Sequence, residues 1–140
     1  MKTIFTIFIG FILLSSFLPS PYKIKEKAPE TKFLREVESA VVTHDADKLM
    51  LMMELDYKRS QHDEFLEGRT VQFLDEFFGS EIPFNSIESA ELINYRLQKG
   101  SKTEYDVVFR LSAGAKVVDS VFNMRKNVKT NTYAIYGAVG

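Results

Sequence analysis

A histidine and its acidic neighbours form the first group of residues that could do chemistry. His62 is followed by Asp63 and Glu64, and Asp56 lies shortly before it. General acid–base catalysis needs an imidazole that titrates near neutral pH and is held by an acceptor, which these carboxylates provide. Acidic residues also suit the first turn of a helix, where the positive helix end stabilises them. The stretch therefore fits a helix start as well as a catalytic base.

Two tyrosines form the second group. Tyr95 and Tyr105 occupy apolar positions of alternating segments, and a buried phenol must find a hydrogen-bond partner. Both residues are therefore candidates to line a pocket mouth and donate to a ligand, although core packing explains them as well. We take His62, Tyr95 and Tyr105 as the candidate ligand-binding residues and assign no catalytic residue.

A third group could begin a metal site. His44 stands beside Asp45 and close to Asp47, in a stretch that separates two apolar helical patterns. Aspartates at such a break cap a helix, and this role accounts for both of them. We therefore expect helix caps, no metal site and no cofactor.

Composition limits the remaining chemistry. The chain has 140 residues, 45% hydrophobic and 26% charged, which is typical of one globular domain. A net charge of -1 supplies no field for a polyanion, so we expect no nucleic-acid partner. The absence of cysteine excludes disulfides, thiolate nucleophiles and thiolate metal sites.

The first residues are typical of an export leader. Lys2 is followed by an apolar run from Ile4 to Leu14 and then by small residues, which predicts a signal peptide over residues 1–20. An apolar helix of about 11 residues is about 16 Å long, roughly half the hydrocarbon thickness of a bilayer. We therefore expect a secreted or periplasmic protein without a stable membrane span, the alternative being an uncleaved anchor. Residues 21–30 are predicted to be a linker, and residues 31–140 one domain.

Apolar residues recur at helical spacing through the first half of this domain. Thr31 follows Pro29 and can cap a first helix, and the cap-type residues at 43–47 separate it from a short second helix. Ser60 begins a third helix, which ends at Gly79 and carries the largest aromatic load. We predict three N-terminal helices, the third lying across the sheet that follows. The apolar positions of this third helix are Phe65, Leu66, Val71, Phe73, Leu74, Phe77 and Phe78.

The second half of the domain changes to a period of two. Apolar and polar residues alternate on both sides of a turn at 99–102, which predicts a hairpin with one buried face. Two more strands follow at 116–124 and 132–139, joined by a polar loop. The buried positions predicted for the hairpin are Ile93, Tyr95, Leu97, Tyr105, Val107, Phe109 and Leu111.

Apolar residues occupy both sides of the third predicted strand. They are Val117 and Val121 on one side, and Val118, Phe122 and Met124 on the other. A core on one face of a single sheet cannot take them all. Either a second copy of the chain covers the outer side, or a bulge near Asp119 and Ser120 exchanges the two sides. We predict a homodimer through the sheet.

The order of these elements resembles a known superfamily. Together with the turn Thr43-His-Asp-Ala-Asp-Lys-Leu49, it is similar to the cone-shaped plan of the nuclear transport factor 2-like superfamily, also called cystatin-like, and to its small secreted bacterial members of uncharacterised function. The resemblance implies an α+β domain whose curved four-stranded antiparallel sheet packs on three N-terminal helices, with a pocket between the two layers. It also implies a short strand between the second and third helices, which residues 56–61 do not show.

Members of this superfamily use such a pocket for ligand binding, isomerase-type catalysis or dimerisation, so the fold does not choose a function. The sequence shows no set of nucleophile, base and orienting residue. We therefore expect a non-enzymatic binding or assembly module that takes a small hydrophobic or amphipathic ligand. The alternative is a cofactor-free lyase, isomerase or hydrolase, with His62 or an acidic residue as base and Tyr95 or Tyr105 donating to an oxyanion.

Overall fold

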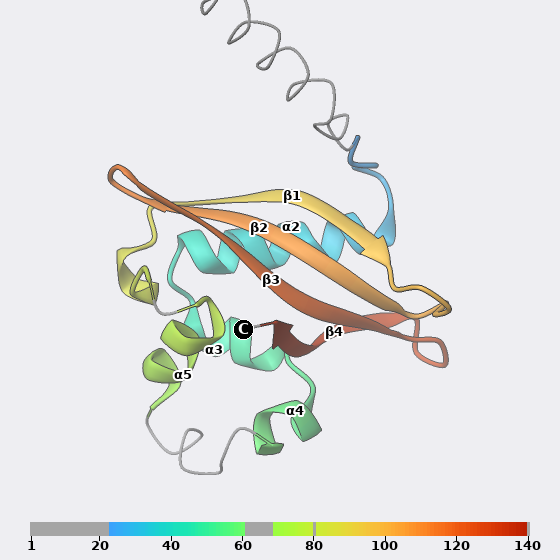
Figure 1. Cartoon of the computed structure of the whole chain (residues 1–140). Helices are drawn as coiled ribbons and strands as arrows, with labels where there is room; N and C mark the ends of the chain where they lie inside the picture. The colour runs from blue at the N-terminus through green and yellow to red at the C-terminus, as the bar shows by residue number, and fades with distance from the viewer. Residues whose placement is uncertain (1–22, 61–68, 80, 140) are drawn as a thin grey trace, which may run out of the picture.

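Four α-helices and a four-stranded antiparallel sheet form the part of the chain that the computed structural model describes, residues 23–60, 69–79 and 81–139 (Figure 1). The helices are α2 (Pro29–Val42), α3 (Ala46–Leu51), α4 (Leu55–Ser60) and α5 (Thr70–Phe77), and the 3-10 helix η2 (Phe84–Ser86) leads into the sheet. The strands, in their spatial order, are β1 (Ser89–Leu97), β2 (Glu104–Ala113), β3 (Lys116–Asn127) and β4 (Thr132–Val139). The predicted α+β class and antiparallel sheet are confirmed.

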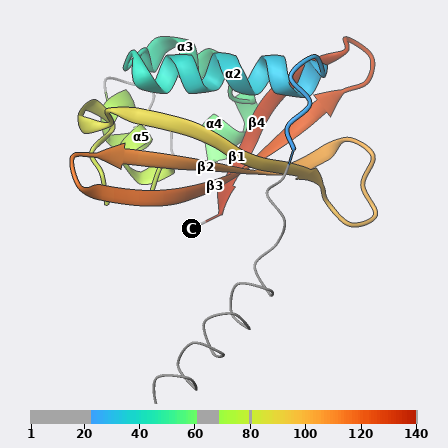
Figure 2. The same ribbon diagram turned by 90° about the horizontal axis from the view of Figure 1, so that it is seen from above.

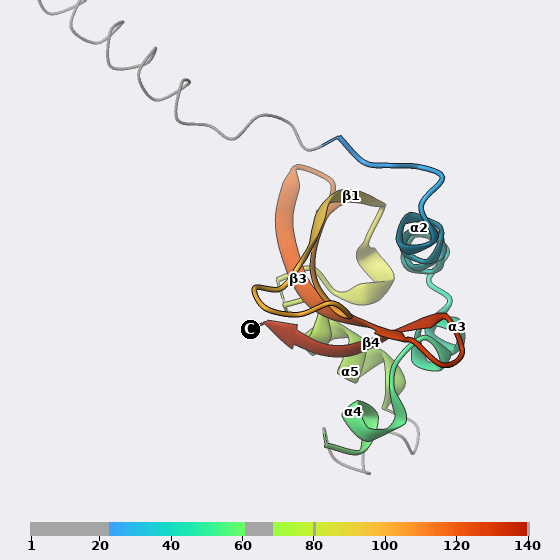
Figure 3. The same cartoon turned by 90° about the vertical axis from the view of Figure 1, so that its right-hand side faces the viewer.

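Helix α2 begins at Pro29, before the predicted cap at Thr31. Proline suits the first helical turn because its fixed φ fits the helix and its missing N–H costs no hydrogen bond. The buried stripe of α2 consists of Leu34, Val37, Ala40 and Val41, and the helix packs along β1. Figure 2 shows α2 and α3 on one side of the sheet, and in Figure 3 α2 lies on the concave side of the curved strands. We call this side the inner face and the opposite side the outer face.

The described residues contain four helices where three were predicted, and the first difference arises at β4. The Ile135 N–H donates to the Met52 carbonyl at 2.8 Å, and the Glu54 N–H donates to the Ile135 carbonyl at 2.8 Å. These bonds make a single parallel bridge at Met53, which ends α3 and lets α4 start separately. The resemblance to the superfamily implies a short strand between the second and third helices, and the bridge at Met53 lies just before the stretch 56–61 in which the sequence shows none.

The second difference concerns the long third helix predicted from Ser60 to Gly79. Arg69 has φ −111° and ψ 27°, which is not helical, so α5 begins at Thr70 with its own N-terminus. The prediction of one helix over this range is wrong for that reason. Phe73 and Phe77 of α5 are nevertheless buried, as expected, whereas Phe65 and Leu66 of the predicted face lie outside the described residues. Phe77 lies against Phe122 of β3, with 5.7 Å between the ring centroids.

The strands follow the predicted alternation in β2 and depart from it in β1. Tyr105, Val107, Phe109 and Leu111 are buried on the inner face, as predicted. In β1 the register shifts at Ile93, because Leu92 pairs with Phe109 whereas Asn94 pairs with Val108. This bulge turns Leu92 inward in place of Ile93, and Leu97 is 48% exposed. The predicted burial of Ile93 and Leu97 is therefore wrong.

Strand β3 is continuous with β2, without a bulge at Asp119 and Ser120. The pairing runs unbroken from Glu104 opposite Arg125 to Ala113 opposite Lys116. The shift in this half of the sheet lies in the pairing of β3 with β4, next to Asn123 and Met124. Apolar residues therefore occupy both faces of β3: Phe122 and Met124 are buried on the inner face, and Val117 and Val121 lie on the outer face.

Candidate functional site

The two predicted tyrosines lie side by side on the inner face. Tyr95 and Tyr105 are 7% and 8% exposed, and their ring centroids are 6.2 Å apart. Tyr133 of β4, which the sequence analysis did not single out, continues the row, with its ring centroid 6.5 Å from that of Tyr105. The third predicted residue, His62, lies outside the described residues.

The first turn of α2 binds the hydroxyl groups of all three tyrosines. The Tyr95 hydroxyl lies 2.7 Å from Oγ1 of the buried Thr31. Tyr105 and Tyr133 both donate to Oε1 of Glu30, at 3.2 and 2.9 Å. We call these five residues the tyrosine cluster, and it holds the start of α2 on three strands at once.

Burial and hydrogen bonding in the tyrosine cluster shift the pKa values of its ionisable side chains further from neutral pH. Burial, followed by the Glu30 charge and its hydrogen bond, raises the pKa of Tyr105 to about 12. Burial and the hydrogen bond to Glu30 also raise the pKa of Tyr133. Burial alone would raise the pKa of Glu30, but hydrogen bonds from its own backbone and from the two tyrosines outweigh it, so this pKa is lowered. A general base or acid works best with a pKa near the working pH, so these shifts suit a structural clasp.

Buried side chains of both layers form one core between the helices and the sheet in the described part of the chain. Residues less than 2% exposed come from the helices and from every strand after β1. The largest of them are Leu34, Leu49, Leu74, Phe84, Ile87, Phe109, Leu111, Phe122, Met124 and Ile135. The polar groups described next lie on the opposite side of the sheet.

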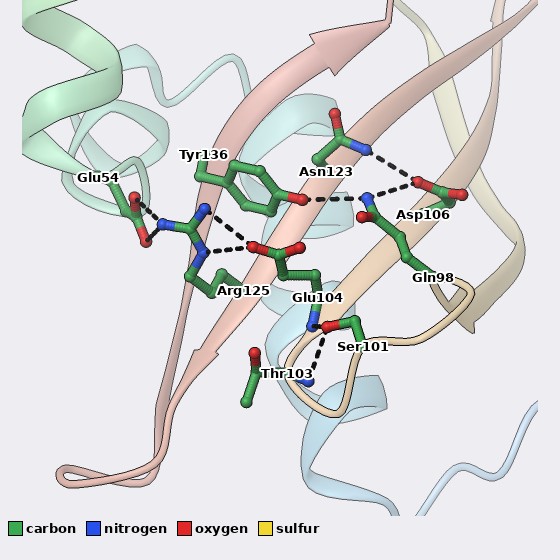
Figure 4. Close-up of polar contacts among 9 residues, drawn as sticks. All are labelled: Glu54, Gln98, Ser101, Thr103, Glu104, Asp106, Asn123, Arg125 and Tyr136. Atoms are coloured by element: carbon green, nitrogen blue, oxygen red, sulfur yellow. Dashed lines mark hydrogen bonds and ion pairs between the residues drawn. The ribbon is translucent and has the colours of Figure 1, made fainter.

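A polar network crosses the outer face near the β1–β2 turn, with Arg125 of β3 at one end (Figure 4). The Arg125 guanidinium lies between two carboxylates, 3.2 Å from Glu54 and 3.1 Å from Glu104. Its central carbon also lies 4.1 Å from the centroid of the Tyr136 ring. Because Glu54 follows the bridge at Met53, the same backbone bonds that end α3 bring this carboxylate to the sheet.

Asp106 of β2 is the other end of the network. Its Oδ1 accepts hydrogen bonds from Gln98 Nε2 and Asn123 Nδ2, both at 2.9 Å. Gln98 Nε2 also donates to the Tyr136 hydroxyl at 3.0 Å, which links the two ends. Tyr136 stands at the register shift of β4, and a bulge of this kind re-aims a side chain. The network thus fixes the Asp106 carboxylate from one side.

A hollow of about 430 Å³ lies on the other side of Asp106, and we call it the outer hollow. Its lining residues are Asn94, Arg96, Asp106, Val108 and Val121. Asn94 Oδ1 is buried and accepts no hydrogen bond from the described residues. The outer hollow therefore combines an unpaired acceptor, a cation, a carboxylate and two aliphatic side chains.

The sequence analysis missed these outer-face residues because each stands at a polar position of an alternating strand. Polar side chains at such positions normally face solvent, and their spacing does not show which of them lie close together in the folded sheet. The bulge that aims Asn94 outward leaves a partial trace in the sequence, since Leu92 and Ile93 are adjacent apolar residues. The sequence around Tyr136 shows no comparable sign of the register shift.

The stretch at His44 is a helix cap. Asp45 Oδ1 accepts a hydrogen bond from the Lys48 N–H at 3.1 Å, as the sequence predicts for the start of α3. His44 has a φ of 55°, and its Nε2 lies 2.7 Å from the Ile87 carbonyl. Among the described residues, no group of three or more histidines or carboxylates is arranged to hold a metal ion.

Comparison with known proteins assigns no function to these features. No protein-family model, curated protein or solved structure matches the chain. None of the helices within residues 23–60, 69–79 and 81–139 combines the length and the hydrophobicity needed to traverse a bilayer.

Proposed function

We propose that the chain is an exported, non-enzymatic binding and assembly module that uses the outer face of its sheet, with a second copy of the chain as its partner. The observation that carries this proposal is an apolar strip on that face, made of Val108, Val117 and Val121 and interrupted by the Arg110–Asp119 ion pair. Val117 is 58% exposed, and Val108 and Val121 lie opposite each other in the register. Exposed apolar side chains that gather on one face are typical of association surfaces.

The charges beside this strip support a two-fold pairing. Glu91 and Arg96 both lie on the outer face of β1, on either side of Asn94, and neither forms an ion pair within the described residues. In a face-to-face pairing whose two-fold axis lies across the strands, the second copy runs in the opposite direction, which brings Arg96 of one copy towards Glu91 of the other. Complementary charge of this kind sets the register of an interface.

Sedimentation at micromolar concentration is expected to show a dimer for the wild type and a monomer for Val121→Glu and Val117→Glu. Each substitution places a charge in the apolar strip, where pairing would remove it from water. Phe122 serves no such test because it is fully buried in the core. The control is Val128→Glu at the β3–β4 hairpin tip, where the valine is 70% exposed and lies off the sheet face. A monomeric wild type, or a monomer produced equally by the control, would contradict the proposal.

We also propose that the domain has the plan of the nuclear transport factor 2-like superfamily. A meander sheet curved around α2, together with the helix order, supports a nuclear transport factor 2-like plan and its cone-like form. The tyrosine cluster disfavours the alternative in which Tyr95 or Tyr105 donates to an oxyanion, because its hydroxyls are engaged within the chain and its pKa shifts run away from neutrality. A small-ligand pocket between helices and sheet, with His62, Tyr95 and Tyr105 as its candidate ligand-binding residues, stays a prediction.

Export is expected to remove the leader. Mass spectrometry of protein recovered from the periplasm or the medium should find chains that begin after residue 14, because the apolar run Ile4–Leu14 forms the core of the predicted signal peptide. Soluble cytoplasmic protein that retains Met1 as its main form would contradict export.

A further inference from the structure

The outer hollow contains a buried acceptor that nothing in the described chain satisfies. Asn94 Oδ1 lines the hollow, yet it accepts no hydrogen bond. Native proteins pair nearly all buried polar atoms, and an exception calls for a specific explanation. The bulge at Ile93 places Asn94 there, and bulges recur beside functional sites because they re-aim side chains. The geometry indicates a donor that comes from outside the chain.

The hollow also presents one positive and one negative group that do not neutralise each other. Arg96 and Asp106 are directly opposite in the register of β1 and β2, but they form no ion pair. The reason lies on the far side of Asp106, where Gln98 and Asn123 hold its Oδ1. Asp106 Oδ2 accepts no hydrogen bond from the described residues, so a carboxylate oxygen and a guanidinium are both available to one ligand.

The rest of the lining is apolar and sets the size of that ligand. Val108 and Val121 are paired across β2 and β3 and line the hollow beside Asp106. Its volume of about 430 Å³ lies towards the lower end of the range for ligand pockets, about 300 to 1,000 Å³. Opposed side chains on neighbouring strands have Cβ atoms about 5 Å apart, so Arg96 and Asp106 can both contact neighbouring charged groups of one small molecule.

We propose that the outer hollow binds a small zwitterion with an aliphatic body, of the class of free branched-chain α-amino acids. The ammonium group donates to Asp106 Oδ2 and, once the Asn94 side chain turns towards the hollow, to Asn94 Oδ1, and the carboxylate accepts from Arg96. The aliphatic side chain covers Val108 and Val121. This site goes beyond the proposed pairing of two copies, and because it shares Arg96, Val108 and Val121 with the pairing surface, the ligand and a second copy compete for it.

The probe that tests this site is L-leucine, titrated into the 15N-labelled protein and followed by the backbone amide NMR signals. The wild type and Val117→Glu are both titrated, since the second variant keeps the face open whether or not the wild type pairs. Saturable shifts are expected at Asn94, Asp106 and Val121. Asn94→Ala and Arg96→Met are each expected to weaken binding by about tenfold or more, because each removes a hydrogen-bonded or charged partner.

Matched controls separate this site from a general charge effect. Arg110 also lies on the outer face but is paired with Asp119 at 2.9 Å, so Arg110→Met should leave the affinity unchanged. Leucinamide lacks the carboxylate and 4-methylpentanoate lacks the ammonium group, so both should bind about tenfold more weakly or worse.

The inference is overturned if leucine gives no saturable shift up to its solubility limit in either protein. Equal affinity for the three compounds, or unchanged affinity in Asn94→Ala, would also overturn it. Leucine binding to a wild type that sediments as a monomer would contradict only the pairing of copies. A wild-type dimer, together with the absence of leucine binding in both the wild type and Val117→Glu, would contradict only the zwitterion site.

Discussion

Replacing Phe77 with alanine is expected to lower the free energy of unfolding by about 3–5 kcal/mol. Phe77 is 6% exposed and joins α5 to the sheet. Its ring lies 4.9 Å from that of Phe78 and 5.7 Å from that of Phe122, measured between centroids. Phe122 in turn stacks on Phe109 of β2 at 5.4 Å, so truncation leaves a cavity inside a continuous cluster of aromatic rings.

Chemical denaturation followed by circular dichroism measures this loss. Val71→Ala is the matched control, because Val71 belongs to the same helix but is 39% exposed, and its cost should stay below about 1 kcal/mol. A loss below about 1 kcal/mol for Phe77→Ala would mean that α5 does not cover the sheet in solution.

The sequence predicted well those elements whose burial follows one uninterrupted period. All four apolar positions predicted for β2 are buried, because this strand lies between two others and has no register shift towards β3. The stripe of α2 was equally readable, since helical spacing brings Leu34, Val37 and Val41 to one side. Such patterns are local and need no knowledge of distant residues.

The errors arose where distant backbone groups decide the local structure. The break between α3 and α4 depends on two hydrogen bonds between residues 52–54 and Ile135, far apart in the chain. The bulge at Ile93 depends on the pairing of β1 with β2, and without it Ile93 reads as an inward residue. A periodicity argument sees neither pairing, so it extended both patterns across the interruptions.

The candidate site shows the same limit more strongly. Tyr95 and Tyr105 were found because a phenol at an apolar position calls for a partner, but that partner proved to be the first turn of α2. The outer hollow was not found, because Asn94, Arg96 and Asp106 each have an ordinary surface pattern. What distinguishes them is the failure of Arg96 and Asp106 to pair, which only the side-chain geometry reveals.

Replacing Glu30 with glutamine is expected to cost about 2 kcal/mol of stability at neutral pH, because two charge-assisted hydrogen bonds become neutral ones. Tyr105 and Tyr133 both donate to Glu30 Oε1, at 3.2 and 2.9 Å. The two bonds join the start of α2 to β2 and β4, so the substitution loosens a contact between elements at the two ends of the domain. Glu36→Gln on the exposed side of α2 is the control and should change stability by no more than about 0.5 kcal/mol.

The cost of Glu30→Gln should depend on pH in a way that a purely steric effect cannot reproduce. The folded state raises the pKa of Tyr105 from 10.0 to about 12, so it holds this proton more tightly than the unfolded chain, and the stabilisation is lost as pH rises from 10 to 12. The folded state lowers the pKa of Glu30 from 4.5, so that contribution is present above pH 4.5 and is lost as pH falls through the lowered value. The wild type and Glu30→Gln should therefore differ most between these windows, and the difference should narrow on both sides.

Urea denaturation of the two proteins at acidic, neutral and alkaline pH measures this dependence, with the Glu36→Gln protein taken through the same series. The comparison uses the difference between proteins, because repulsion between other charges changes all three alike. Burial, the largest cause of the raised Tyr105 pKa, remains in Glu30→Gln, so the variant should keep a smaller alkaline decline of its own. A difference between wild type and Glu30→Gln that stays constant across the series would show that Glu30 acts through packing alone. The tyrosine hydroxyls would then be satisfied by water rather than by the carboxylate.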